Sequence, residues 1–197
     1  MSVAQIIIVA ALIGVALWLV SSYNRLVALR GHLQHAFGQI DVPLRRRFGL
    51  IAELVESARR HIAPEGGLLQ AVVDARDHAW KCSRAAALCP GDLNAMSALS
   101  GASGMLAEAL AGLLAQVESC PPLQADAAMV RLSEELTTTE NRIAFARQAY
   151  NDSVTDYNLA IGQFPVNLVA GIFRLSPSQP LQSCECPIRR GPVRAQY

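Results

Sequence analysis

The chain begins with a long apolar segment that contains no charged side chain. Between Val3 and Val20 it reads VAQIIIVAALIGVALWLV, and the first charged side chain is that of Arg25. A helix rises about 1.5 Å per residue, so about 20 apolar residues span a hydrocarbon core about 30 Å thick. Trp18 and Tyr23 lie near the end of the segment, where amphipathic rings favour the interface between lipid and water. The pattern predicts a transmembrane helix whose ends are Val3 and Val20.

A cleaved signal peptide is the alternative explanation of this segment. Ser21 and Ser22 offer small residues at a cleavage position, but no Lys or Arg precedes the apolar run. The run is also longer than the apolar region of a signal peptide, which is about 7 to 15 residues. Basic residues gather after the run, at Arg25, Arg30, Arg45, Arg46 and Arg47. Because basic residues stay on the cytoplasmic side of a membrane, we expect the N-terminus outside and the main domain in the cytoplasm.

After this segment, hydrophobic residues recur every three or four positions in four stretches of the chain. The stretches cover residues 24–62, 67–87, 92–117 and 126–164. This spacing places the apolar side chains on one face of a helix. Turns and helix breakers separate the stretches, at residues 63–67, 89–92, 120–122 and 165. The pattern predicts an all-α protein, in which a single N-terminal transmembrane helix precedes an elongated antiparallel four-helix bundle.

Two residues modify the expected helices. Pro43 lies inside the first stretch, where it removes a backbone donor and clashes with the carbonyl of Gln39. We therefore expect a kink or a short break in the helix at Pro43. Asp92 is placed to cap the third helix, because its side chain can accept a hydrogen bond from a free backbone N–H of the first turn.

The expected domain organisation has three parts. They are an anchor over residues 1–23, a helical-bundle domain over residues 24–173, and a tail over residues 174–197. The tail is rich in Pro, Ser, Gln and Arg, a composition typical of disorder. Residues 168–173 are apolar, so we expect them either to dock on the bundle or to lie at the membrane surface.

Charge predicts one helix pairing and argues against one class of partner. The chain has 17 basic and 16 acidic residues, a net charge of +1, and so has no overall attraction for nucleic acid. Residues 24–62 contain seven Arg and three acidic residues, whereas residues 118–165 contain seven acidic residues and three Arg. The opposite charges of these two stretches predict that the first and last bundle helices lie side by side.

Several motifs in these helices occur together in one known family. They are YNRLVALR from Tyr23, AFGQIDVPLRRR from Ala36, VVDAR from Val72, LSEEL from Leu132, TENRI from Thr139, ARQAYND from Ala146 and AGIF from Ala170. In order and spacing they resemble the LemA family of bacterial membrane-anchored proteins. The resemblance implies a helix in the bacterial inner membrane with a short N-terminus outside, a helical-bundle domain and no catalytic activity. Pro43 departs from the family pattern, which usually has a polar helix former there.

Arg45, Arg46 and Arg47 form a basic cluster with two possible roles. The cluster could bind anionic lipid or an acidic partner, or it could form ion pairs with carboxylates of the last helix. About 20 helical residues separate it from the apolar segment, which places it about 30 Å from the bilayer, beyond the Debye length of about 8 Å. This distance favours ion pairs within the bundle.

The dipeptide Tyr-Asn occurs twice in the last stretch, as Tyr150-Asn151 and as Tyr157-Asn158. A spacing of seven is about two helical turns, so both tyrosines lie on one face with both asparagines beside them. One interpretation is a recognition stripe. The other, which we favour, is a packing seam in which each ring is buried and each hydroxyl is hydrogen-bonded.

Catalytic and metal-binding patterns are weak in this sequence. His32 and His35 lie three residues apart, and Cys184 and Cys186 lie in the tail, but no C-x₂-C or H-x₃-H spacing occurs. The sequence also contains no phosphate-binding loop, dinucleotide fingerprint, H-E-x-x-H or G-x-S-x-G motif. We therefore expect no enzyme activity, no metal, no cofactor and no small-molecule substrate. A bundle that binds metal through carboxylates or histidines is the alternative.

These features together predict a membrane-anchored, non-enzymatic scaffold or adaptor. Its cytoplasmic surface would contact an unknown protein partner or other copies of the same chain. If the apolar segment is cleaved near Ser22, the mature protein would instead be a periplasmic helical protein.

Overall fold

The computed structural model describes residues 3–60 and 67–182 of the chain. Every regular element in these residues is a helix, which confirms the all-α class expected from the sequence. The helices are α1 (Val3–Arg59), α2 (Leu68–Leu88), α3 (Leu93–Ser119), α4 (Pro121–Gln124), α5 (Ala127–Gly162) and α6 (Val166–Ile172).

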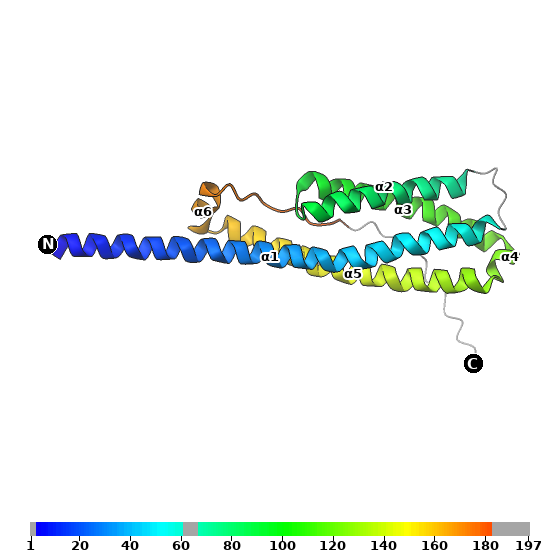
Figure 1. Cartoon of the computed structure of the whole chain (residues 1–197), viewed down its shortest axis with the longest axis horizontal. Helices are drawn as coiled ribbons and strands as arrows, with labels where there is room; N and C mark the ends of the chain where they lie inside the picture. The colour runs from blue at the N-terminus through cyan, green and yellow to red at the C-terminus, as the bar shows by residue number, and fades with distance from the viewer. Residues whose placement is uncertain (1–2, 61–66, 183–197) are drawn as a thin grey trace, which may run out of the picture.

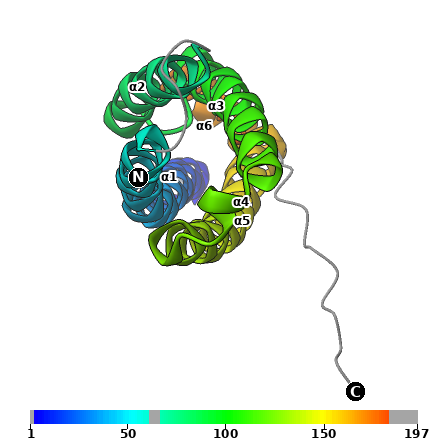
Figure 2. The same cartoon turned by 90° about the vertical axis from the view of Figure 1, so that its right-hand side faces the viewer.

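The helices associate mainly in close pairs. The two longest, α1 and α5, lie side by side, as their opposite charges predicted, and they run in opposite directions (Figure 1). The shorter α2 and α3 form a second pair, and α2 also packs against α1. Seen from the end, α1, α2, α3 and α5 follow one another around a common interior (Figure 2). The short helix α6 returns to lie against both α5 and α1.

Helix α1 has two different environments along one continuous helix of 57 residues. From Val3 to Val20 every side chain is exposed except the partly buried Leu19. From Ser22 to Ala58 the same helix contributes buried residues to the core at helical spacing. Its apolar N-terminal part is long and apolar enough to cross a membrane and has no buried residue in its most apolar window. Helix α3 also meets this criterion, but its window is 39% buried, as in a core helix.

The break expected at Pro43 is absent, because α1 continues through this residue without interruption. Ile40 and Leu44, on either side of the proline, are both buried in the core. Their packing holds the helical path although the proline cannot donate the usual backbone hydrogen bond. The break was expected from the local cost of the proline alone, without the tertiary contacts that offset it. A kink within the continuous helix, the other form of the expectation, stays a prediction.

Aromatic contacts connect α1 to α5 and to α2. The ring of Phe37 meets that of Tyr150 of α5 edge-on, with centroids 5.7 Å apart. The ring of Phe48 meets that of Trp80 of α2 in the same way at 5.6 Å. Such edge-to-face pairs contribute about 0.5–1.5 kcal/mol beyond the apolar area that they bury.

Two aspartates fix the starts of the later helices. Asp92 caps α3, as the sequence predicted, because its carboxylate accepts a hydrogen bond of 2.9 Å from the backbone N of Ala95. Asp126 caps α5 by accepting one of 2.9 Å from the backbone N of Ala128. Each cap satisfies a donor that the first turn of a helix leaves free.

Candidate functional site

The repeated Tyr-Asn dipeptide lies on the inner side of α5. The ring of Tyr150 is fully buried and that of Tyr157 is 2% exposed. The Tyr150 hydroxyl donates a hydrogen bond of 2.9 Å to the backbone carbonyl of Gln179. Burial raises the pKa of the Tyr150 hydroxyl far above its ordinary value, so it stays protonated and remains a donor. Burial also raises the pKa of Tyr157, and the nearby charge of Arg30 opposes this effect.

The two asparagines bind an extended segment near the C-terminus. The Asn158 amide donates to the Ser178 carbonyl at 2.8 Å and accepts from the Ser178 backbone N at 2.8 Å. The Asn151 amide makes the same pair of bonds with Leu181, at 3.1 and 2.9 Å. Each side chain therefore satisfies both backbone groups of one residue, as a neighbouring β-strand would.

The spacing of the repeat matches the spacing of the residues that it binds. Seven helical residues separate Asn151 from Asn158, a rise of about 10 Å. Three extended residues separate Ser178 from Leu181, and they also cover about 10 Å. Two asparagines seven positions apart on α5 can therefore bind two backbone residues that lie three positions apart in the C-terminal segment.

We call residues 174–182 the strap, because they connect α5 to the α2–α3 pair. The backbone N of Gln179 donates to the carbonyl of Gly91 at 3.0 Å, and that of Gln182 donates to Ser100 Oγ at 3.3 Å. Leu181 is buried. A Cβ atom on Gly91, whose φ is +89°, would lie 2.7 Å from Ser178 Oγ, so both the turn and the strap require glycine at this position.

The strap differs from the disordered tail that we expected over residues 174–197. Residues 174–182 have defined hydrogen-bond partners, whereas residues 183–197, which include Cys184 and Cys186, lie outside the described residues. Composition did not predict the strap, since its partners on α5 lie 20 to 30 positions earlier in the chain.

The three arginines of the basic cluster each have a carboxylate partner. Arg45 pairs with Asp41 of its own helix at 2.7 Å. Arg46 reaches Glu135 of α5 at 2.5 Å. Its hydrogen bond holds the pKa of Glu135 below the ordinary value, and Arg131 adds to this effect. The structure thus places two of the three arginines, Arg46 and Arg47, against carboxylates of α5, the arrangement that the distance from the membrane favoured.

Arg47 and Glu140 form a buried ion pair between α1 and α5. Their Nε and Oε1 atoms lie 2.6 Å apart, and the arginine side chain is 5% exposed. The contact lacks hydrogen-bond geometry, so Nε and Nη2 of Arg47 and Oε1 of Glu140 are buried without a hydrogen-bond partner. Burial raises the pKa of the Glu140 carboxyl, and the charges of Arg47 and Arg147 oppose this increase.

An open groove of about 600 Å³ lies between α1 and α5, next to this ion-pair network. Val42 and Phe145, which are 70% and 79% exposed, line it together with Arg46 and Arg142. Sequence analysis did not identify this groove. Val42 and Phe145 are large apolar residues that fall outside the apolar stripes of their helices. Their position off the stripe could have indicated an exposed apolar surface.

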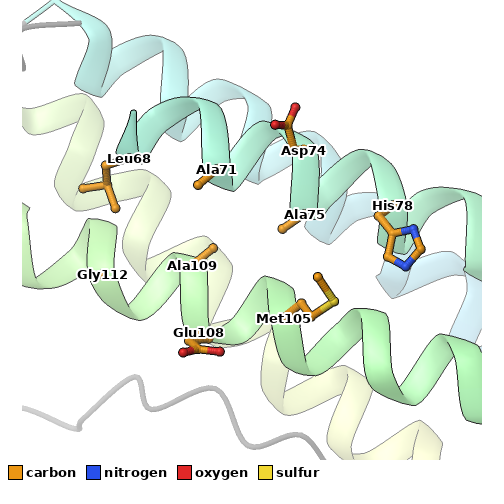
Figure 3. A pocket seen from close by; sticks show the side chains of 9 residues that line it. All are labelled: Leu68, Ala71, Asp74, Ala75, His78, Met105, Glu108, Ala109 and Gly112. Carbon is orange, nitrogen blue, oxygen red and sulfur yellow. The ribbon is translucent and has the colours of Figure 1, made fainter. Parts of the chain in front are cut away.

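A second groove, of about 520 Å³, lies between α2 and α3 (Figure 3). Its lining combines small residues, such as Ala75 on α2 and Gly112 on α3, with the larger side chains of Leu68, Asp74, His78, Met105 and Glu108 (Figure 3). In the part of the chain that the structure describes, no group of three or more His, Cys, Asp or Glu residues is placed to hold a metal ion. His32 and His35 are exposed on α1.

Comparison with known proteins gives a consistent result. The chain is 26% identical to two magnetosome proteins of Paramagnetospirillum magneticum strain AMB-1, MamQ 1 and MamQ 2, over 183 residues. Each alignment covers 85% of this chain and 67% of the relative. It is 28% identical to the magnetosome protein MamQ of Magnetospirillum gryphiswaldense over 179 residues, which cover 83% of this chain and 66% of the relative. The sequence model of the LemA family matches residues 36–192, and the chain therefore belongs to the LemA family.

Proposed function

We propose that this protein is a membrane-anchored, non-enzymatic scaffold of the bacterial inner membrane. The observation that carries the proposal is the continuity of α1. One helix supplies both the exposed apolar segment from Val3 to Val20 and the core positions from Ser22 to Ala58. A protein in water seldom exposes such a large apolar surface, whereas lipid solvates it readily.

In this proposal α1, α2, α3 and α5 form one elongated antiparallel four-helix bundle on the cytoplasmic side. No loop separates the bundle from the membrane helix, so the bundle cannot swing freely. Arg59 lies 36 positions after Tyr23 on the same helix, which corresponds to about 54 Å, and this is the depth over which the scaffold extends. Arg25 and Arg30 directly follow the apolar segment, and basic residues on this side support the cytoplasmic orientation.

The groove between α1 and α5 is the surface that we propose for a protein partner. Exposed Phe145 and Val42 offer apolar area, and Arg46 and Arg142 offer charge beside it. Aromatic residues and arginine are enriched in protein interfaces. This surface suits an apolar segment with acidic residues, from another protein or from a second copy. The names of the relatives refer to the magnetosome and state no reaction, which is consistent with a structural role.

The first test concerns the anchor and its orientation. Membranes that contain the full-length chain are washed with alkaline carbonate, and reporter enzymes are fused after Arg190. We expect the intact chain to stay in the pellet. We also expect activity from a reporter enzyme that works only in the cytoplasm, and none from one that works only in the periplasm. Release of the chain, a mature N-terminus near Ser22, or activity only in the periplasmic form would each contradict the proposal.

The second test concerns the partner surface. A photo-crosslinking residue replaces Phe145 in intact membranes, and the same residue at the 84% exposed Leu88 of α2 is the control. We expect a discrete crosslinked product from position 145 and none from position 88. Equal yields from both positions would mean that the groove is not the binding surface.

A further inference from the structure

An exposed apolar patch lies on the outer face of α6 and on the residues next to it. We define it as Phe164, Leu168, Ile172 and Phe173, each of which is at least half exposed. Phe164 lies in the turn between α5 and α6, Leu168 and Ile172 belong to α6, and Phe173 directly follows α6. Val169 and Ala170 of α6 are buried, so the helix has one face on the domain and one exposed apolar face.

The patch lies at the level where the apolar segment of α1 ends. The ring of Phe173 contacts that of Tyr23, with centroids 4.5 Å apart and the ring planes tilted by 40°. Tyr23 follows Val20 by three residues, which is about 4.5 Å along a helix. Figure 1 shows α6 beside α1 at the point beyond which α1 continues alone toward the N-terminus.

The charges at this end of the molecule have one sign. Residues 3–40 and 157–182 contain no Asp or Glu. Exposed arginines are present there, with Arg25 two residues after Tyr23 and Arg174 directly after Phe173. Basic side chains near a membrane surface are attracted to anionic headgroups by about 1 kcal/mol each.

We propose that the α6 patch is a second membrane contact, which inserts into the interface of the leaflet that α1 leaves. The apolar side chains would lie at the boundary between headgroups and acyl chains, as in interfacial amphipathic helices, with Arg25 and Arg174 beside anionic headgroups. This inference rests on the proposed membrane anchor and deepens it. A single transmembrane helix can still tilt in the bilayer, and a domain that is continuous with it tilts with it. A second contact beside the helix axis restricts that tilt and so fixes the direction in which the scaffold extends.

The test measures the depth of single fluorescent labels in the full-length protein. All five cysteines are replaced by serine, and one cysteine is introduced by Ile172→Cys or, as an independent position, by Leu168→Cys. The labelled protein is reconstituted in vesicles of phosphatidylcholine and phosphatidylglycerol that contain spin-labelled lipids. Leu12→Cys reports on the apolar segment of α1. Val130→Cys is the matched control, because this side chain is also exposed but lies near the start of α5, at the opposite end of the domain from α6 and outside the proposed partner groove.

We expect quenching by lipids spin-labelled near the headgroup to be about threefold stronger at positions 172 and 168 than at position 130. Aqueous iodide should show the opposite order. If labels at 172 and 168 are quenched by iodide as strongly as the label at 130, the patch does not touch lipid. Protection from both quenchers would mean that a protein or a second copy covers the patch, and would also overturn the proposal. If the label at position 12 is not quenched by lipids spin-labelled within the acyl chain, the proposed anchor itself is wrong. This outcome separates failure of the anchor from failure of the α6 patch alone.

Discussion

At the scale of single residues, two side-chain amides hold the strap in place. A carboxamide has both a donor and an acceptor, so Asn151 and Asn158 can each satisfy a complete backbone residue. The two tyrosines of the repeat are buried beside them. The same dipeptide therefore supplies packing through one residue and backbone recognition through the next.

Replacement of Asn158 by aspartate tests this role. The carboxylate of Asn158→Asp can still accept from the Ser178 N, but it repels the Ser178 carbonyl to which the amide donates. Loss of a buried hydrogen bond costs about 1–3 kcal/mol, so we expect proteolytic cleavage within the strap to become about tenfold faster. Limited proteolysis of the full-length protein in detergent measures the rate. Asn94→Asp, at an exposed position near the start of α3, is the control, and equal cleavage rates in the two variants would contradict this role.

The buried pair of Arg47 and Glu140 gives a second prediction. Glu140→Ala leaves the arginine charge buried without compensation, and we expect a loss of about 3–5 kcal/mol in the free energy of unfolding. Glu135→Ala removes the partner of the more exposed Arg46, and its effect should be much smaller. Chemical unfolding of both variants in the same detergent measures the difference. If both variants lose a similar amount of unfolding free energy, burial does not make the Arg47–Glu140 pair more important for stability than the exposed Arg46–Glu135 pair.

The pH dependence of this pair follows from the raised pKa of Glu140. The folded state holds the proton of this carboxyl more tightly than the unfolded state, whose pKa is near the ordinary 4.5. The stability of the wild type relative to Glu140→Gln should therefore fall as the pH rises above 4.5 through the raised pKa. Unfolding midpoints of both proteins over a pH series test the sign. If the wild type instead gains stability relative to Glu140→Gln as the pH rises, the result would contradict the raised pKa of Glu140.

At the scale of elements, local sequence rules predicted most helices and failed where distant contacts decide. Apolar spacing and turn residues predicted the long helices but not the short α4 and α6, and Asp92 was correctly identified as a cap. The uninterrupted path of α1 at Pro43 depends on the burial of Ile40 and Leu44, which no local rule contains. The strap depends on asparagines of α5, and the groove at Phe145 depends on how α1 and α5 meet.

The persistence of α1 through Pro43 predicts that the proline lowers stability. Proline in a helix interior costs about 3 kcal/mol relative to alanine, and no break relieves that cost here. We expect Pro43→Ala to raise the free energy of unfolding by about 1–3 kcal/mol. Val42→Ala, at the exposed neighbouring position, is the control and should change stability little. Chemical unfolding measures both variants, and no gain in Pro43→Ala would indicate that the local geometry already accommodates the ring.

At the scale of the whole molecule, the absence of a loop between apolar segment and core is the feature with the widest consequence. A helix that continues from lipid into a packed domain transmits its direction to that domain, whereas a flexible linker would leave the direction free. With α6 as a second contact, the far end of the molecule would stand at a defined height above the membrane. The scaffold would then position a partner at that height as well as binding it.

The height of the far end can be measured directly. A donor dye on Arg59→Cys, in the background without native cysteines, is paired with acceptor dyes on lipid headgroups. An upright domain predicts a donor height of about 54 Å, and a flexible Gly-Ser insertion after Val20 should lower the mean height and broaden its distribution. The variant with the insertion keeps its apolar segment and still binds the membrane. A change in donor height therefore reports only on the connection between the apolar segment and the domain. A short distance that is the same with and without the insertion would mean that the domain lies flat on the membrane, and that the continuity of α1 does not orient it.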